Sequence, residues 1–130
     1  MKKVILHEFD PVIYPFKLWV VISSNLNEIA GNFIDGKTSE SIDLSDIEDH
    51  TDAFALNNYV KHKETNKNGF LVVFKNKKAC AVPIIAHEAT HVARFIWEHL
   101  GEEVTGVESD AYLVEWIVDC IYRVKTNNFG

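Results

Sequence analysis

Through the first half of the chain, apolar residues alternate with polar ones or stand in short runs, and this pattern predicts β-strands. Strands are expected over residues 3–9, 16–23 and 70–74, with an irregular strand over residues 53–63. The strand at 16–23 is apolar at most positions, which indicates that both of its faces are covered.

Turn and cap signals separate these strands. Asn25 and Glu28 have the spacing of a capping box, and the apolar positions that follow predict a helix that ends near Gly36. Residues 37–50 are polar and are expected to form a loop. The Lys-Asn-Gly sequence at 67–69 predicts a tight turn before the last strand.

The second half of the chain has helical periodicity. A helix over residues 84–100 is predicted because one set of apolar residues falls within about 80° of arc. This stripe consists of Ile85, Ala89, Val92, Ile96 and Leu100. His87 and His91 fall roughly opposite it, so we expect both histidines to face away from the core.

A second helix is predicted over residues 107–126, and it is so apolar that we expect it to be largely enclosed. Its one polar stripe consists of Glu108, Glu115, Asp119 and Arg123. The short connector makes the two helices antiparallel neighbours, with the start of the second near the end of the first. The elements together predict an α+β fold with a small twisted antiparallel or mixed β-sheet, in a single domain over residues 1–130.

Composition excludes several classes of protein. The net charge of −6 argues against a nucleic-acid-binding surface. No run of about 18 apolar residues is present, so no membrane span is expected. Acidic residues interrupt the apolar start of the chain, which therefore fails as a signal peptide, and we expect a cytoplasmic protein. Cys80 and Cys120 stand far apart in apolar contexts and are expected to be reduced core thiols.

The segment from His87 to His91 reads His-Glu-Ala-Thr-His and so contains the HExxH pattern. Positions four residues apart in a helix lie on one face, one turn apart, so the two imidazoles can bind one metal ion. Glu88 stands beside them as a candidate general base. The alternative is a chance pattern on a solvent-exposed helix face.

A catalytic zinc site usually has three protein ligands and one open position. His99 lies about 12 Å from His91 along the helix axis and cannot bind the same ion. Glu108, which opens the second helix, is the best candidate for the third ligand, and Asp110 and Glu115 are the alternatives. An acidic residue also suits the first turn of a helix because of the helix dipole alone, without any metal.

An HExxH helix followed by a second helix that begins Glu108-x-x-Ala111 resembles the gluzincin metallopeptidases. The chain is most similar to the smallest members of that family, including the ImmA-type peptidases of phages and mobile elements. The resemblance covers about residues 70–125. It implies a minimal zincin-like fold, in which the sheet packs against an HExxH active-site helix and a second, glutamate-bearing helix.

The resemblance also implies a function. It predicts a zinc-dependent metallopeptidase of phage or mobile-element origin, in which His87, His91 and Glu108 bind Zn²⁺ and Glu88 is the catalytic base. Tyr112, one turn after Glu108, is a candidate for stabilising the oxyanion of the transition state. Further candidates for that role, which the sequence does not place in space, are His50, His62 and Tyr59.

The expected partner is a protein or peptide substrate, with no nucleic acid and no membrane. The alternative function is a catalytically inactive or accessory metal-binding module that has the same fold and takes part in protein interactions.

Overall fold

The structure is a computed structural model that describes residues 4–12, 14–48, 50–100 and 107–126, without the side chains of Val107 and Glu108. The strands of this part of the chain are β1 (His7–Phe9), β2 (Lys17–Ile22), β3 (Phe33–Asp35), β4 (Ala53–Ala55), β5 (Val60–His62) and β6 (Asn68–Phe74). Its α-helices are α1 (Leu26–Gly31), α2 (Val82–Leu100) and α3 (Val107–Thr126), and a short 3₁₀ turn, η1 (Lys77–Ala79), precedes α2. The prediction of an α+β fold is confirmed.

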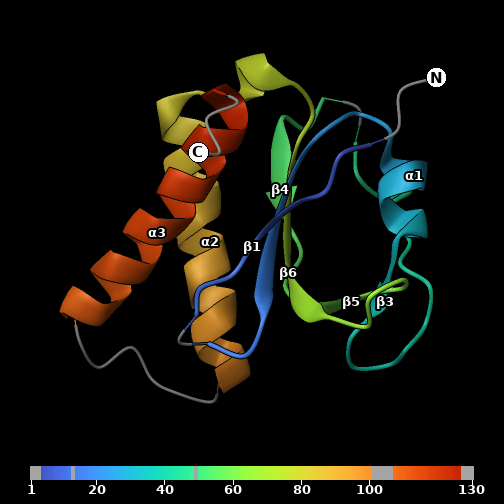
Figure 1. Cartoon of the computed structure of the whole chain (residues 1–130). Coiled ribbons are helices and arrows are strands. Elements are labelled where there is room, and N and C mark those ends of the chain that lie inside the picture. The colour runs from blue at the N-terminus through green and yellow to red at the C-terminus, as the bar shows by residue number, and fades with distance from the viewer. Residues whose placement is uncertain (1–3, 13, 49, 101–106, 127–130) are drawn as a thin grey trace.

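A parallel pair of strands forms the centre of the sheet (Figure 1). β2 and β6 run in the same direction, with Leu18 opposite Phe70 and Ile22 opposite Phe74. β1 pairs antiparallel with β2, both β4 and β5 pair antiparallel with β6, and β3 pairs antiparallel with β5. The sheet is therefore mixed.

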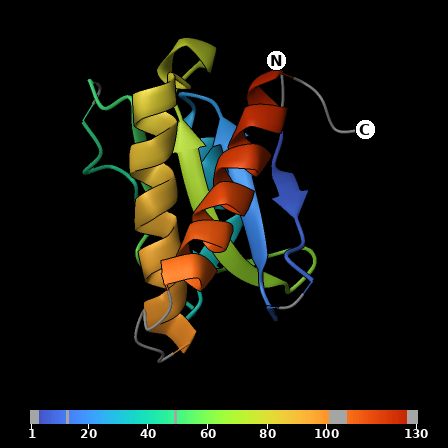
Figure 2. The same ribbon diagram turned by 90° about the vertical axis from the view of Figure 1, so that its left-hand side faces the viewer.

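Both faces of the sheet are covered, because alternate residues of β2 and β6 point to opposite sides. Leu18 and Phe70 belong to a core that includes α2 and α3. Trp19 and Leu71 belong to a second core, which includes α1 and Leu44 of the following loop. Figure 1 shows α2 and α3 on one side of the sheet and α1 on the other, and Figure 2 shows α2 and α3 lying side by side across it. The prediction that the second strand is covered on both faces is confirmed.

The first helix is shorter than predicted. Asn25 caps it as expected, since its side-chain oxygen accepts a hydrogen bond from the backbone N–H of Glu28 at 3.2 Å. The helix ends at Gly31 rather than near Gly36, because Phe33 begins β3 and is fully buried in the second core. β3 was not predicted, since a strand of three residues is too short to show a period.

Two strand predictions were only partly right. The irregular strand expected over residues 53–63 is divided into β4 and β5, which lie along the same edge of β6. Of the strand expected over residues 3–9, β1 covers the last part, and residues 1–3 lie outside the described part of the chain.

The turn predicted at residues 67–69 was wrong. The chain reverses over residues 63–67, where Asn66 has a φ of 59°, and Asn68 already begins β6. Gly69 is required for a different reason, because a Cβ there would overlap the Lys17 carbonyl of the neighbouring strand. This glycine therefore permits close strand packing rather than a turn.

The two long helices follow their predictions closely. α2 begins at Val82, two residues earlier than expected, with Pro83 in its first turn, and α3 has the predicted bounds. The expected enclosure of α3 was wrong on its outer face, where Tyr112 is 66% and Tyr122 is 54% exposed. Cys80 and Cys120 are both buried and free, as expected of core thiols.

Candidate metal centre

His87 and His91 lie one turn apart on the solvent-facing side of α2. The opposite face of the helix packs on the sheet through Ile85, Ala89, Val92 and Ile96, all of which are buried. Both histidines are exposed, and their Nε2 atoms lie 3.1 Å apart. The prediction that this pair faces away from the core is confirmed.

The separation of the two Nε2 atoms fits a shared metal ion. Two nitrogen ligands of a tetrahedral zinc ion, each at 2.0–2.1 Å, are about 3.3 Å apart. The observed 3.1 Å also allows one ring to donate a hydrogen bond to the other, depending on the tautomer. In both cases the two nitrogen atoms converge on one point at the surface, so His87 and His91 fit as two of the ligands of one ion.

Phe95 holds the ring of His91 in place. The two rings stack with their centroids 5.9 Å apart and their planes 11° from parallel. Phe95 stands four residues after His91, so this contact follows from helical spacing, and that spacing in the sequence would have predicted it. A metal ligand held by a neighbouring side chain loses less rotational freedom when it binds.

Glu88 lies on the flank of α2 that faces away from α3. It precedes Trp97, which contacts α3, by nine residues, and so lies about 180° from it around the helix. The side chain is 7% exposed, on a helix that passes beside β4. Burial raises the pKa of the Glu88 carboxyl, and the positive charge that His87 and His91 can carry partly opposes this rise. A raised pKa makes the carboxylate a stronger base, which favours its acceptance of a proton.

Asp110 defines how α2 and α3 lie against each other. Its Oδ1 accepts a hydrogen bond from the Trp97 indole at 3.0 Å, and its Oδ2 lies 3.7 Å from the Arg94 guanidinium. These contacts confirm that α3 starts beside the end of α2. They also direct the Asp110 carboxylate toward residues beyond His91, which removes most of the support for Asp110 as the third ligand.

Glu108 precedes Asp110 by two residues. Measured along the axis of α3, the backbone of Glu108 is therefore farther than that of Asp110 from the level of the two histidines. The side chain of Glu108 lies outside the described part of the structure. Glu115 is exposed. It lies about 7.5 Å beyond Asp110 along the helix axis, which brings it close to the level of His91. Around the helix, however, it is about 140° from Asp110. The identity of the third ligand therefore stays a prediction, with Glu108 and Glu115 as its candidates.

The α3 position that faces α2 at the level of the histidines is apolar. Val114 is half-buried against the core, about 40° around α3 from Asp110, whereas Val118 lies about 80° around and also lines the outer face of the helix with Glu115 and Tyr122. Among the residues with described side chains, no group of three or more histidines, cysteines or acids is placed to hold a metal ion.

Tyr112 does not lie toward the histidines. It is about 200° around α3 from Asp110, and it lines a groove with Pro11 and Tyr14 on the other side of the helix. The further candidates for oxyanion stabilisation have other contacts. The ring of Tyr59 lies 4.6 Å from that of His99, the ring of His62 lies 6.1 Å from that of Trp19, and Nε2 of His50 lies 2.9 Å from the Glu48 carboxylate.

Within the described residues, no helix is both long enough and apolar enough to cross a lipid bilayer. Comparison of the chain with protein families, with curated proteins and with solved structures finds no match.

Proposed function

We propose that this protein is a zinc-dependent peptidase of minimal size. The observation that carries the proposal is the convergence of the His87 and His91 Nε2 atoms, 3.1 Å apart, beside the buried carboxyl of Glu88. The three side chains come from a single rigid helix whose opposite face is packed on the sheet. Such a helix holds the geometry of the ligands and the base without help from a loop.

Zinc, when bound, supplies charge that polarises a substrate carbonyl and lowers the pKa of a water molecule. Glu88 would accept a proton from the water molecule as its oxygen bonds to the substrate carbonyl carbon, and would return that proton to the amine as the C–N bond breaks. Its burial supports this role, because a raised pKa brings the carboxyl closer to the pH at which the enzyme works. Tyr112 takes no part in the proposed mechanism, because it lies on the other side of α3.

The substrate that the fold suits best is an extended peptide. β4 pairs with β6 along one edge, and no described strand pairs with its other edge. An extended segment can add to such an edge through main-chain hydrogen bonds. Since α2 passes beside β4, a segment bound there would run close to the flank that carries Glu88.

The experiment measures zinc binding and hydrolysis in the same set of variants. Calorimetric titration of the metal-free protein is expected to show that one zinc ion binds per chain. Either His87→Ala or His91→Ala is expected to abolish zinc binding. His99→Ala, an exposed histidine on the same helix, is the matched control and should bind zinc normally. Glu88→Gln should still bind zinc, but its rate of peptide hydrolysis should fall at least about 100-fold. The rate is measured by mass spectrometry with an unstructured protein as the substrate. A chain that binds no zinc, or equal hydrolysis by Glu88→Gln and wild type, would refute the proposal.

A metal-binding module without catalytic activity is the second candidate. It is favoured by the position of Val114, which occupies the α3 face nearest the histidines where a ligand would be expected. In that case zinc binds at His87 and His91, and neither wild type nor Glu88→Gln cleaves any substrate.

A further inference from the structure

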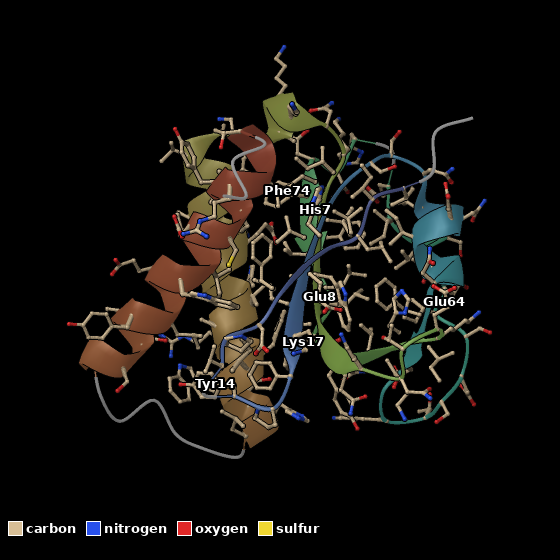
Figure 3. All side chains as sticks on the ribbon, viewed as in Figure 1. His7, Glu8, Tyr14, Lys17, Glu64 and Phe74 are labelled. Atoms are coloured by element: carbon tan, nitrogen blue, oxygen red, sulfur yellow. The ribbon has the colours of Figure 1, made fainter. Side chains whose placement is uncertain are left out.

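A groove lined by aromatic side chains lies on the side of α3 that faces away from α2. Its first part, of about 310 Å³, is lined by Pro11, Tyr14, Ser109, Tyr112, Leu113 and Trp116. Its second part, of about 510 Å³, shares Tyr112 and Trp116 and continues along the helix to Tyr122. Figure 3 shows Tyr14 on the side of the sheet that α2 and α3 cover.

The aromatic side chains of this groove are more exposed than a stable core needs. Tyr112 is 66% exposed, Tyr122 is 54% exposed, and Trp116 between them is half-buried. A contiguous surface of large aromatic side chains indicates an interaction site, whereas single exposed apolar residues do not. Tyrosine and tryptophan are also the residues that contribute most to binding when they are buried by a partner.

The loop that borders the groove is strained. Val12, next to Pro11, has a φ of 69° and is 84% exposed. A β-branched residue rarely adopts this left-handed conformation, and such strain clusters at binding sites. The other end of the loop is held in place, since Tyr14 stacks on Phe16 with ring centroids 5.5 Å apart and meets Trp97 edge to face.

The charge beside the groove is negative. Glu115 and Asp119 line its second part, which has no lysine or arginine among its described lining residues. Arg123 lies 3.0 Å from Asp119, so the Asp119 carboxylate is paired, and no described cation lies within ion-pair distance of Glu115. A basic side chain of a ligand would therefore find a carboxylate partner at Glu115 and aromatic faces close by.

We propose that this groove binds an extended, proline-containing peptide that carries a basic residue. Proline-rich segments adopt the polyproline II conformation and dock into aromatic-lined grooves, where the preformed peptide loses little entropy. The groove runs from Ser109 to Tyr122, which is about 20 Å along α3. A polyproline II segment of about six residues has that length.

Binding at this groove is measured apart from zinc binding, because Glu115, which lines the groove, is also a candidate metal ligand. The experiment uses the full chain in the presence of a chelator, so that no zinc-dependent hydrolysis can destroy the probe. The probe is a fluorescein-labelled peptide of about ten residues. Its proline-rich core of about six residues has the length of the groove, and one arginine stands next to this core. Its two controls replace the prolines by alanine and the arginine by glutamine. Fluorescence anisotropy is expected to show saturable binding of the first peptide and weaker binding of both controls.

The variants locate the site. Tyr112→Ala removes an exposed ring and should weaken binding at least about fivefold. Glu115→Gln should weaken binding of the arginine peptide and leave the glutamine peptide unchanged. Val82→Ala, which truncates a 75% exposed apolar side chain on α2, is the control and should bind as wild type does. Circular dichroism checks that each variant is folded, and Tyr112→Phe should retain most of the affinity if ring packing is the main contact.

Two results would overturn the proposal. In the first, the proline-rich peptide binds no better than its alanine control, or equally well to Tyr112→Ala. In the second, sedimentation shows that wild type self-associates and that Tyr112→Ala stays monomeric, which would make this face an interface between two copies of the chain.

Discussion

The indole of Trp97 donates a hydrogen bond to the carboxylate of Asp110 at 3.0 Å, and this contact fixes the start of α3 beside the end of α2. We expect Asp110→Ala to lower the free energy of unfolding by about 1–3 kcal/mol, because it leaves the indole N–H without its partner. Zinc affinity should change by less than about twofold, because Asp110 is directed away from the histidines. Urea denaturation and calorimetry test both statements, and Asp119→Ala, which removes an exposed carboxylate from the same helix, is the control.

The third metal ligand is tested by a pair of variants. The resemblance to the gluzincins predicts that Glu108→Gln lowers zinc affinity at least about tenfold, because a catalytic site with two ligands holds the metal weakly. Glu115→Gln, on the same polar stripe, should change it little. A larger loss of zinc affinity in Glu115→Gln than in Glu108→Gln would identify Glu115 as the third ligand. Its position along α3 is closer to the level of His91.

Phe95 is expected to contribute to zinc affinity without touching the metal. Phe95→Leu keeps an apolar side chain but removes the ring that stacks on His91 at 5.9 Å. We expect zinc affinity to fall about three- to tenfold, with the stoichiometry unchanged. NMR relaxation of the His91 ring should show greater ring mobility in the metal-free variant. Unaltered affinity would mean that the helix alone orients this imidazole.

Glu88 should make the metal-free protein more sensitive to pH. Because burial raises its pKa, the neutral carboxyl is favoured in the folded state, and its contribution to stability is present below the ordinary value of 4.5. The contribution is lost as the pH rises through the folded-state pKa. Glu88→Gln should therefore be more stable than wild type at neutral pH, with a higher urea midpoint. Near pH 4 the two should have similar urea midpoints. A difference of the same size at both pH values would contradict this account.

Cys120 should have a similar effect at alkaline pH. Burial, with a smaller contribution from the Asp119 charge, raises the pKa of its thiol from 9.0 to about 12. The stability that depends on the neutral thiol is fully present below pH 9 and is lost as the pH rises toward 12. Between neutral pH and about pH 10, the free energy of unfolding should fall by about 1 kcal/mol more in wild type than in Cys120→Ala. Denaturation of both proteins at neutral and alkaline pH measures the difference.

The long helices were predictable from the sequence because their apolar positions repeat over many turns. The stripe through Ile85 and Ile96 gave the direction of His87 and His91, and α3 has the predicted bounds. The three-residue strands were not predictable, since they are shorter than the period that would reveal them. Gly69 was misread because a glycine signals close backbone contact as well as a turn.

The site was predictable only as far as it lies on one helix. The spacing of His87, Glu88 and His91 determines their arrangement, because helix geometry relates them directly. The direction of Tyr112 and Glu115 depends on how α3 is rotated about its own axis, and the contacts of Asp110 and the packing of Val114 determine that rotation. Nothing in the spacing of the sequence specifies such tertiary contacts.

The central pairing of β2 with β6 joins Leu18 to Phe70, which are far apart in the chain. Non-local contacts of this kind slow folding, because the entropy of closing a long loop is lost before the contacts form. The helix that carries His87 and His91 packs on this sheet, so we expect the two imidazoles to reach their final positions only after the sheet has formed. Zinc should then act mainly on the folded chain, lengthening its lifetime by slowing unfolding and changing the rate of folding little.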